Sequence, residues 1–328
     1  MREALFYKVL EGDKVRCELC PRECVIPKGG KGFCRVRRHE DGKLLAENYL
    51  RCSSYALDPI EKKPLYHFYP GSTIFSIGTW GCNFTCQFCQ NWQIAQEEPE
   101  TVLLTPQKVK EIVQERKSEH CIGVAYTYSE PTVWYEFVLE TAQLVREAGG
   151  KNVLVTNGYI AEEPLRQLLP LIDAMNIDIK AFNQDFYRRV CCGDLEAVKR
   201  TAEIAVQHCH IELTTLLITG MNDSDEEIEK LVDWIAVRLH PGVPLHFSRY
   251  FPNYKLNAPP TPVETMNRAR EIARKKLRYV YLGNVSGAGS NTYCYHCNAL
   301  LVERPQGIHH LTAGKTCPSC GVPIEIVI

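Results

Sequence analysis

Short apolar segments alternate with amphipathic ones through most of the chain, from about residue 73 to residue 282. The apolar segments are rich in β-branched and aromatic residues and are mostly bounded by Gly, Pro, Asn or Asp, a pattern typical of strands. We expect strands at 73–79, 122–127, 153–156, 174–179, 211–218, 245–249 and 279–282.

The segments between these strands carry helix signals. Thr105 followed by Pro is typical of an N-cap and first helical position. Ser224 with Glu227, and Thr261 with Glu264, have the spacing of capping boxes. We expect helices over 107–117, 132–147, 196–207 and 266–276, and another that carries an apolar stripe at 228, 231, 232 and 235.

Six strand-then-helix units followed by a final strand favour a parallel sheet with right-handed crossovers. We therefore predict an α/β fold whose sheet curls into a partial (β/α)6 barrel, with an open doubly wound sheet as the alternative. In such a fold, catalytic residues lie in the loops at the carboxyl ends of the strands.

Composition excludes several classes of protein. Hydrophobic residues make up 45% and charged residues 23%, which is typical of a soluble globular chain and excludes general disorder. A net charge of −1 gives no overall basic field, so nucleic acid is not an expected partner. No apolar run approaches a membrane span of roughly 20 residues, and the first residues lack a signal-peptide pattern. We expect a cytoplasmic protein.

Sixteen cysteines are the anomaly, because a cytoplasmic chain of this size uses cysteines as metal or redox ligands rather than in disulfides. Eleven of them form three clusters: Cys17, Cys20, Cys24 and Cys34; Cys82, Cys86 and Cys89; and Cys294, Cys297, Cys317 and Cys320. The clusters suggest an N-terminal metal-binding segment (1–64), a central catalytic part (65–283) and a C-terminal module (284–328).

The central cluster has only three cysteines, spaced C-x3-C-x2-C directly after the first expected strand. Three thiolates can bind three irons of a cubane cluster and leave the fourth iron open. An open coordination position is typical of a catalytic site. The alternative is a three-cysteine zinc site completed by His67.

The two outer clusters have four cysteines each, which closes a metal site. Paired C-x2-C motifs separated by residues 298–316 predict a structural zinc-ribbon-like module at the C-terminus, with a closed iron–sulfur site as the alternative. The N-terminal spacing fits either zinc or a second [4Fe-4S] cluster, to which Cys52 could add a ligand. Five basic residues flank it and form either a solvated face or a surface for an acidic partner: Lys28, Lys31, Arg35, Arg37 and Arg38.

These motifs resemble the radical S-adenosylmethionine (SAM) superfamily, and within it the radical SAM member of the AmmeMemoRadiSam system, a group similar to pyruvate formate-lyase activating enzymes. The resemblance rests on GTWGCNFTCQFCQNW (78–92), TYSEP (127–131), VTNGY (155–159), NIDIKAF (176–182), FSRYFPNY (247–254), the motifs between residues 19 and 38, and the C-terminal cysteine pairs.

The resemblance implies a barrel of radical SAM type in which Cys82, Cys86 and Cys89 hold a [4Fe-4S] cluster. SAM would bind the open iron and, on one-electron reduction, yield a 5′-deoxyadenosyl radical that abstracts hydrogen from an unidentified substrate. Expected partners are an electron donor of flavodoxin or ferredoxin type and other proteins of the system. Two alternatives are an activase that makes a glycyl radical on a partner protein, and a non-catalytic metal-stabilised binding protein.

The resemblance also suggests roles for residues at the strand ends. Ser129 and Glu130 occupy the place of a Gly-Gly-Glu-Pro motif that meets the SAM amine, although Tyr128 and Ser129 replace its glycines. The other expected cofactor-binding residues are Phe88, Asn157, Asp178 and Lys180, and the expected catalytic residues beside the cysteines are His246 and Arg249. Asp178 and Lys180 alternate with apolar residues along their strand, so we expect both to point to one face, into the barrel mouth. Each also has a structural alternative: a core aromatic, a helix-capping acid, an Asn-Gly turn, a structural ion pair or a residue that only lines the barrel.

Overall fold

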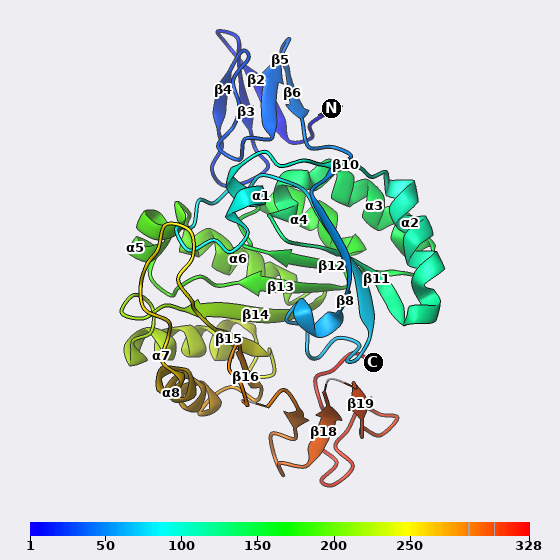
Figure 1. Cartoon of the computed structure of the whole chain (residues 1–328), viewed down its shortest axis with the longest axis vertical. Coiled ribbons are helices and arrows are strands. Elements are labelled where there is room, and N and C mark those ends of the chain that lie inside the picture. Colours follow the sequence, from blue (N-terminus) through cyan, green and yellow to red (C-terminus); the bar gives the residue numbers. More distant parts are fainter. Residues whose placement is uncertain (288, 305) are drawn as a thin grey trace.

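The computed structural model describes residues 1–287, 289–304 and 306–328. Its centre is an eight-stranded sheet in the order β16-β15-β14-β13-β12-β11-β9-β8, flanked by helices (Figure 1). The strands are β8 (Ser54–Pro59), β9 (Thr73–Gly78), β11 (Cys121–Tyr126), β12 (Lys151–Thr156), β13 (Ala174–Asp178), β14 (His210–Leu217), β15 (Leu245–Arg249) and β16 (Val280–Gly283).

Every pairing from β9 to β16 is parallel, and only β8 joins the sheet antiparallel, against β9. All seven expected strands are present, which confirms an α/β fold with a mostly parallel sheet. Strand β8 was not expected, because an edge strand is covered on fewer sides and shows a weaker apolar pattern. Its Tyr55 is 63% exposed.

The helices follow the strands as the alternation predicted. They are α1 (Trp92–Gln96), α2 (Pro106–Glu115), α3 (Tyr135–Glu147), α4 (Glu162–Leu168), α5 (Gln184–Phe186), α6 (Leu195–Ala205), α7 (Asp225–Trp234) and α8 (Val263–Arg274). Shorter 3-10 turns are η1 (Ile60–Lys62), η2 (Arg116–Glu119), η3 (Pro131–Trp134) and η4 (Leu169–Leu171), and π-helical turns are η5 (Tyr187–Cys191) and η6 (Ile235–Leu239).

Two helix starts agree with the sequence signals. The Thr105 hydroxyl accepts a hydrogen bond from the Lys108 amide at 3.1 Å, and the Ser224 hydroxyl accepts one from the Glu227 amide at 3.3 Å. The carboxylate of Glu227 accepts from the Phe182 amide at 2.8 Å. It therefore joins α7 to the loop after β13 instead of closing the second half of the capping box.

The capping box predicted at Thr261 is wrong. Helix α8 begins after Pro262, and no side chain caps it. The buried Thr261 hydroxyl instead donates to the Leu217 carbonyl at 2.5 Å and accepts from the Tyr250 amide at 3.2 Å. A threonine with two tertiary partners does not turn back to its own helix.

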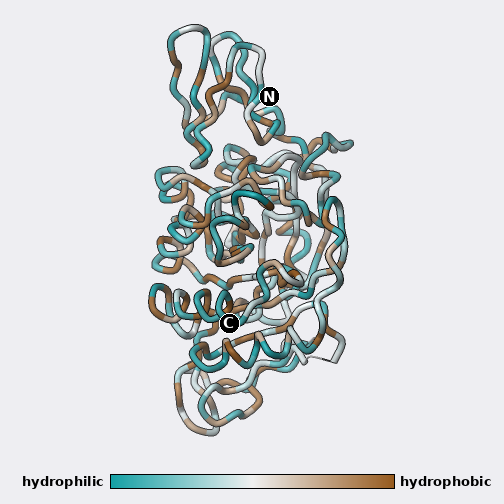
Figure 2. Tube along the Cα trace, turned by 90° about the vertical axis from the view of Figure 1, so that its left-hand side faces the viewer, coloured by the Kyte–Doolittle hydropathy of each residue, from teal (hydrophilic) through white to brown (hydrophobic). Residues whose placement is uncertain are grey.

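Small antiparallel sheets lie at both ends of the long axis (Figures 1 and 2). One N-terminal sheet consists of β1 (Arg2–Glu3), β6 (Lys43–Ala46) and β5 (Arg37–Glu40), and a second consists of β2 (Tyr7–Leu10), β3 (Lys14–Cys17) and β4 (Val25–Pro27). A separate pair joins β7 (Arg51–Cys52) to β10 (Val102–Leu103). The C-terminal one pairs β17 (Thr292–Tyr293), β18 (Leu300–Glu303) and β19 (Ile308–His309).

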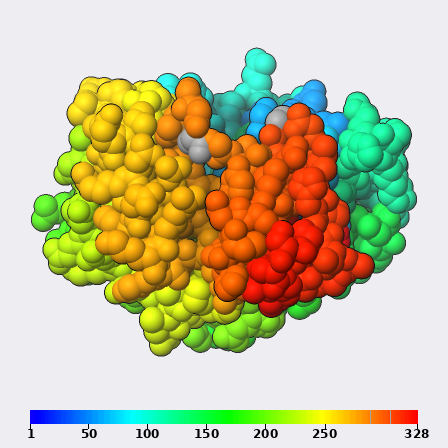
Figure 3. Space-filling view, turned by 90° about the horizontal axis from the view of Figure 1, so that it is seen from below, coloured from blue at the N-terminus to red at the C-terminus, as the bar shows by residue number. Residues whose placement is uncertain are grey.

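The C-terminal module covers much of the lower face of the molecule (Figure 3). It returns to the central sheet through Val327, whose amide donates to the His67 carbonyl at 2.8 Å. The buried Arg304 donates to the Thr292 hydroxyl at 2.8 Å and to the Tyr66 carbonyl. None of the helices in the described part of the chain is long and apolar enough to cross a membrane.

Candidate active site

A cavity of about 370 Å³ opens at the carboxyl ends of the parallel strands. This volume lies within the roughly 300–1,000 Å³ that is usual for ligand sites. Of the eleven residues expected to bind the cofactors or act in catalysis, nine line it: Cys82, Cys86, Phe88, Cys89, Ser129, Glu130, Asn157, Asp178 and Lys180. The fold thus brings together side chains from the loops after β9, β11, β12 and β13.

The cysteine loop after β9 is shaped by the backbone around it. Gly81 has a φ of +87°, and a Cβ there would lie 2.7 Å from the Cys34 carbonyl oxygen. The Thr85 and Gln87 amides each donate at 3.0 Å to carbonyls of the π-helical turn η5, those of Cys191 and Val190. The loop is therefore held on two sides before any metal binds.

The three cavity cysteines form a donor set that suits a metal. Burial raises the pKa of the Cys82 thiol well above its ordinary value. A hydrogen bond with Cys191 and then burial do the same for Cys86, and burial raises the pKa of Cys89 to about 11. Buried thiols of this kind ionise when a cation compensates their charge. Sequence reasoning did not single out Cys191, so it missed this contact with Cys86.

Glu130 is a buried carboxylate held by three donors. Its Oε1 accepts from the Thr132 amide at 3.0 Å and the Thr156 hydroxyl at 2.7 Å, and its Oε2 accepts from the Asn157 amide at 2.8 Å. Burial nevertheless raises the pKa of Glu130 above its ordinary value. A carboxylate offers about four acceptor positions, so one remains for a ligand in the cavity. The residue is both the N-cap of η3 and a wall of the site.

Asn157 connects the loop after β12 to the cysteine loop. Its Nδ2 donates to Asn83 Oδ1 at 2.8 Å and lies 3.7 Å from Cys82 Sγ, while its Oδ1 accepts from the Tyr159 amide at 2.8 Å. Asn83 Nδ2 in turn donates to the Tyr159 carbonyl at 2.7 Å. The amide that was expected to contact a ligand thus fixes the position of Cys82.

Asp178 and Lys180 face the same side, as the strand alternation predicted, and their side chains form an ion pair of 2.6 Å within the cavity wall. Phe88 is buried and packs against Phe186, with the ring centroids 6.0 Å apart. The Ser129 hydroxyl donates to the Thr79 carbonyl at 2.8 Å.

Sequence reasoning missed one charged wall of the cavity. Lys63 Nζ and the Tyr128 hydroxyl both donate to Asp58 Oδ2 at 2.9 Å, and Lys63 lies 4.9 Å from the Tyr128 ring centroid. Despite burial, these hydrogen bonds lower the pKa of Asp58 to about 2. The signal in the sequence was Tyr128 itself, which adopts a φ of +69° at a position where a glycine was expected.

The structure does not bring His246 and Arg249 into the cavity. His246 Nε2 lies 2.6 Å from Oε2 of the buried Glu212, and Arg249 Nε donates to the Thr261 carbonyl at 2.7 Å. On β15 the cavity-lining residue is Ser248. His67 also lies elsewhere, with its ring nitrogens 2.7 Å from the Tyr281 hydroxyl and the Glu325 carbonyl, so it does not complete a zinc site with the central cysteines.

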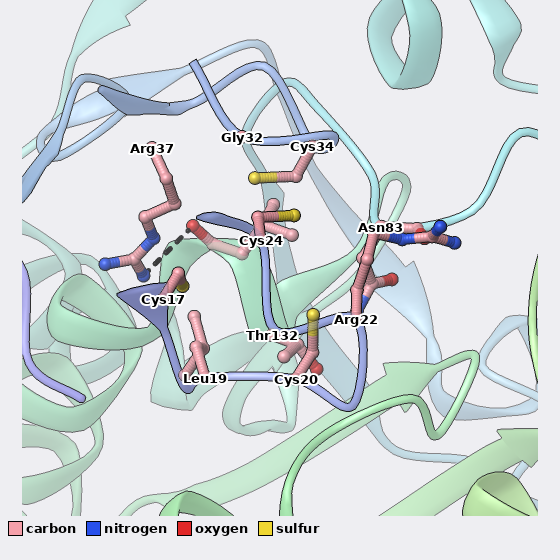
Figure 4. Close-up of a pocket in the computed structure, with 11 residues that line it drawn as sticks. Cys17, Leu19, Cys20, Arg22, Cys24, Gly32, Cys34, Arg37, Asn83 and Thr132 are labelled. Atoms are coloured by element: carbon pink, nitrogen blue, oxygen red, sulfur yellow. Dashed lines mark hydrogen bonds between the residues drawn. The ribbon is translucent and has the colours of Figure 1, made fainter. Parts of the chain in front are cut away.

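The four N-terminal cysteines line a second, much smaller cavity of about 20 Å³ (Figure 4). Arg22, Arg37 and Asn83 share this lining, and Figure 4 shows the four cysteine side chains around this pocket. Cys52 is not among the lining residues, because its thiol donates to the Ser54 carbonyl at 3.2 Å. It is therefore not a ligand of this group.

Four of the basic residues near these cysteines have partners within the chain. Lys31 and Arg38 both pair with Glu47, and Arg35 donates to the Ala95 carbonyl. Arg37 is 1% exposed and pairs with Glu136 at 2.7 Å. The flanking charges thus hold the N-terminal segment together more than they offer a surface to an acidic partner.

The C-terminal cysteines come together as a tight group. Cys294 and Cys320 lie 3.6 Å apart between their sulfurs, and so do Cys297 and Cys317, with all four sulfurs within 4.8 Å of one another. This geometry fits a four-cysteine metal site.

Comparisons with known proteins show what the chain is similar to. The sequence pattern of the Radical SAM superfamily matches residues 76–235. The chain is 46% identical to "Uncharacterized protein MJ0808" of Methanocaldococcus jannaschii, over 100% of both chains. It is 27% identical to another protein of that organism, provisionally named a glycyl-radical enzyme activating enzyme, over 63% of this chain and 78% of that one. The crystal structure of a radical SAM methyltransferase from Sphaerobacter thermophilus has the same fold, with a TM-score of 0.53 and 17% identity over 71% of each chain.

Proposed function

The chain belongs to the radical SAM superfamily and is a radical SAM enzyme, and on this premise we propose that Cys82, Cys86 and Cys89 hold its [4Fe-4S] cluster and that the cavity beside them binds SAM. A cluster and SAM bound there supply a 5′-deoxyadenosyl radical, which takes a hydrogen atom from the substrate. The observation that carries the proposal is that these three thiols and Glu130 line one cavity.

The chain's own residues would orient SAM in this cavity. The free acceptor position on Glu130 suits the SAM ammonium, because charge-assisted hydrogen bonds are the strong ones. Phe88 would pack against the adenine, and the Asp178–Lys180 pair would fix the polar groups of the cofactor. Asn157 positions Cys82, and the Lys63–Asp58–Tyr128 wall closes the site toward β8.

We place the enzyme in an AmmeMemoRadiSam-type system, on the motifs that it shares with that group. An electron donor of flavodoxin or ferredoxin class would reduce it, and proteins of the system would be its partners. A reducing compartment such as the cytoplasm suits its exposed thiols and clusters. The C-terminal cysteines would hold zinc, since four thiolates close the coordination sphere.

The test is anaerobic reconstitution with iron and sulfide, followed by dithionite and SAM. The expected products are methionine and 5′-deoxyadenosine. Cys86→Ala should abolish both, while Cys209→Ala, a matched control outside the cavity, should leave them unchanged. No 5′-deoxyadenosine from a reconstituted protein that contains iron would overturn the proposal.

A glycyl-radical activase is a second candidate, favoured by the similarity to an activating enzyme over 63% of the chain. In that case, incubation with SAM, reductant and a partner protein should yield a doublet radical signal on the partner in electron paramagnetic resonance (EPR) spectra. A small-molecule substrate would instead consume SAM without that signal.

A further inference from the structure

The spacing of sulfur atoms distinguishes a single metal ion from a cubane cluster. Zinc lies about 2.3 Å from each thiolate, which places tetrahedral sulfurs about 3.8 Å apart. In a cubane each thiolate binds a different iron, so the sulfurs stand farther apart. The C-terminal pairs, at 3.6 Å, have the spacing of a single ion.

The N-terminal cysteines do not have that spacing. Across residues 1–287, 289–304 and 306–328, the C-terminal four are the only group in which three or more potential ligand atoms lie within 4.8 Å of one another. The N-terminal four therefore fail this criterion, although all of them line one cavity. The three central cysteines, which the family assigns to a cluster, fail it in the same way.

The space between the N-terminal sulfurs points in the same direction. The cavity they line measures about 20 Å³, which holds roughly one water molecule. Four sulfurs placed to bind zinc at about 2.3 Å leave no room for a water molecule between them, because each sulfur would overlap a water-sized sphere at the zinc position. A cavity of this size fits a group larger than a single ion.

Two of the residues that line this cavity also have a buried hydrogen-bond donor without a partner. Arg22 and Arg37 line it, and the Nε of each is buried without a hydrogen-bond acceptor. Buried polar atoms normally find a partner. A cubane brings sulfide sulfurs in addition to the thiolates, and hydrogen bonds to the sulfurs are a regular feature of such clusters.

We infer that Cys17, Cys20, Cys24 and Cys34 hold a second [4Fe-4S] cluster, which takes up and releases one electron. Asn83 lines its cavity and the neighbouring Cys82 lines the central one, so a single loop separates the two sites. A low-potential donor of ferredoxin or flavodoxin class would lose one electron, and the cluster would gain it, with no bond made or broken and no proton moved. The inference does not depend on what the enzyme acts on.

The first test removes the central site. The full-length variant Cys82→Ala/Cys86→Ala/Cys89→Ala, reconstituted anaerobically with iron and sulfide, should keep about four irons and four sulfides per chain, beside about one zinc. Dithionite should then give an EPR signal that SAM does not change. A protein without iron and with about two zinc ions would overturn the inference, and so would iron that dithionite does not reduce.

Two further variants on this background locate the iron. Adding Cys20→Ala/Cys24→Ala should remove the iron and leave the zinc. Adding Cys191→Ala, which deletes another buried thiol, should leave the iron in place. Iron that survives the first change, or that disappears with the second, would contradict the assignment.

The wild-type protein provides a test without substitutions. After reconstitution with ⁵⁷Fe, Mössbauer spectra should account for about eight irons per chain: four in a cluster whose open iron changes when SAM is added, and four in a cluster that SAM does not change. Only four irons, in a single cluster that responds to SAM, would refute the second cluster. If the spectra show only four irons, none of which changes when SAM is added, and the triple-alanine variant retains all four, the second cluster is supported and the proposed function is refuted.

Discussion

Replacing Arg37 by Met should weaken the attachment of the N-terminal segment to the central sheet. Arg37 begins β5, and its Nη1 lies 2.7 Å from Oε1 of Glu136 in α3. The two side chains are only 2% and 4% exposed. The same Glu136 oxygen accepts from the Leu5 amide at 2.9 Å. A buried carboxylate thus depends on one guanidinium for its neutralisation.

Removing one partner of a buried ion pair costs about 3–5 kcal/mol, because the other charge stays buried without compensation. We expect Arg37→Met and Glu136→Leu each to lower the free energy of unfolding by this amount. The double variant should lose less than either single one, since two apolar side chains of similar size can pack together. The coupling free energy should therefore be at least about 3 kcal/mol.

Urea unfolding of the wild type, the two single variants and the double variant measures this double-mutant cycle. Tryptophan fluorescence reports the unfolding, and the four proteins are compared at equal metal content. The exposed pair Arg2 and Glu140, at 3.1 Å with side chains 52% and 41% exposed, is the matched control and should change little. If the double variant loses the sum of the two single losses, the pair does not act as a unit and the argument from burial is refuted.

Three other outcomes follow from the structure. Burial, which Glu212 partly opposes, lowers the pKa of His67 to about 4. Between pH 6.5 and 4 the unfolded chain binds a proton that the folded chain does not, so the free energy of unfolding should fall by about 3 kcal/mol as the pH decreases over this range. In pH-dependent denaturation, His67→Gln should abolish this decrease. Gly193→Ala should lower the free energy of unfolding in urea by about 1–3 kcal/mol and reduce iron binding, because the alanine Cβ would lie 2.3 Å from the Phe84 ring in the cysteine loop. An unchanged iron content would contradict this. Cys297→Ser should release about one zinc per chain in elemental analysis, and a retained zinc would show that the group is not its ligand set.

The sequence predicted the parallel strands well because most of their residues are buried and many are β-branched or aromatic. It predicted the cavity positions of Asp178 and Lys180 because side chains alternate along a strand. His246, whose catalytic role the resemblance suggested, shares a face with Ser248 but lies two residues, or roughly 7 Å, deeper along β15. Depth along a strand depends on where the strand ends, and the pattern of residue types does not fix that end.

Contacts between distant segments explain the remaining differences. Thr261 has the sequence context of a cap, but its two hydrogen-bond partners, Leu217 and Tyr250, come from β14 and the end of β15. The N-terminal strands have only two to four residues, too few for a periodic pattern. Spacing alone favoured zinc for the C-terminal cysteines and left zinc and iron–sulfur open for the N-terminal ones; the distances between the sulfurs distinguish the two groups.

The docking of the N-terminal segment also has a consequence for how the protein is made. This segment leaves the ribosome before the central sheet, yet it is held by residues synthesised much later: the Leu19 carbonyl accepts from the Ala161 amide at 3.1 Å, and Arg22 donates to the Cys192 carbonyl. At a translation rate of about 5–20 residues per second, the 158 residues from Cys34 to Cys192 take roughly 8 to 30 s. During that time the thiols of the four N-terminal cysteines have no docking surface on the rest of the chain. We therefore expect a metal at this site to be loaded only after translation has passed the middle of the chain, although its cysteines are made early.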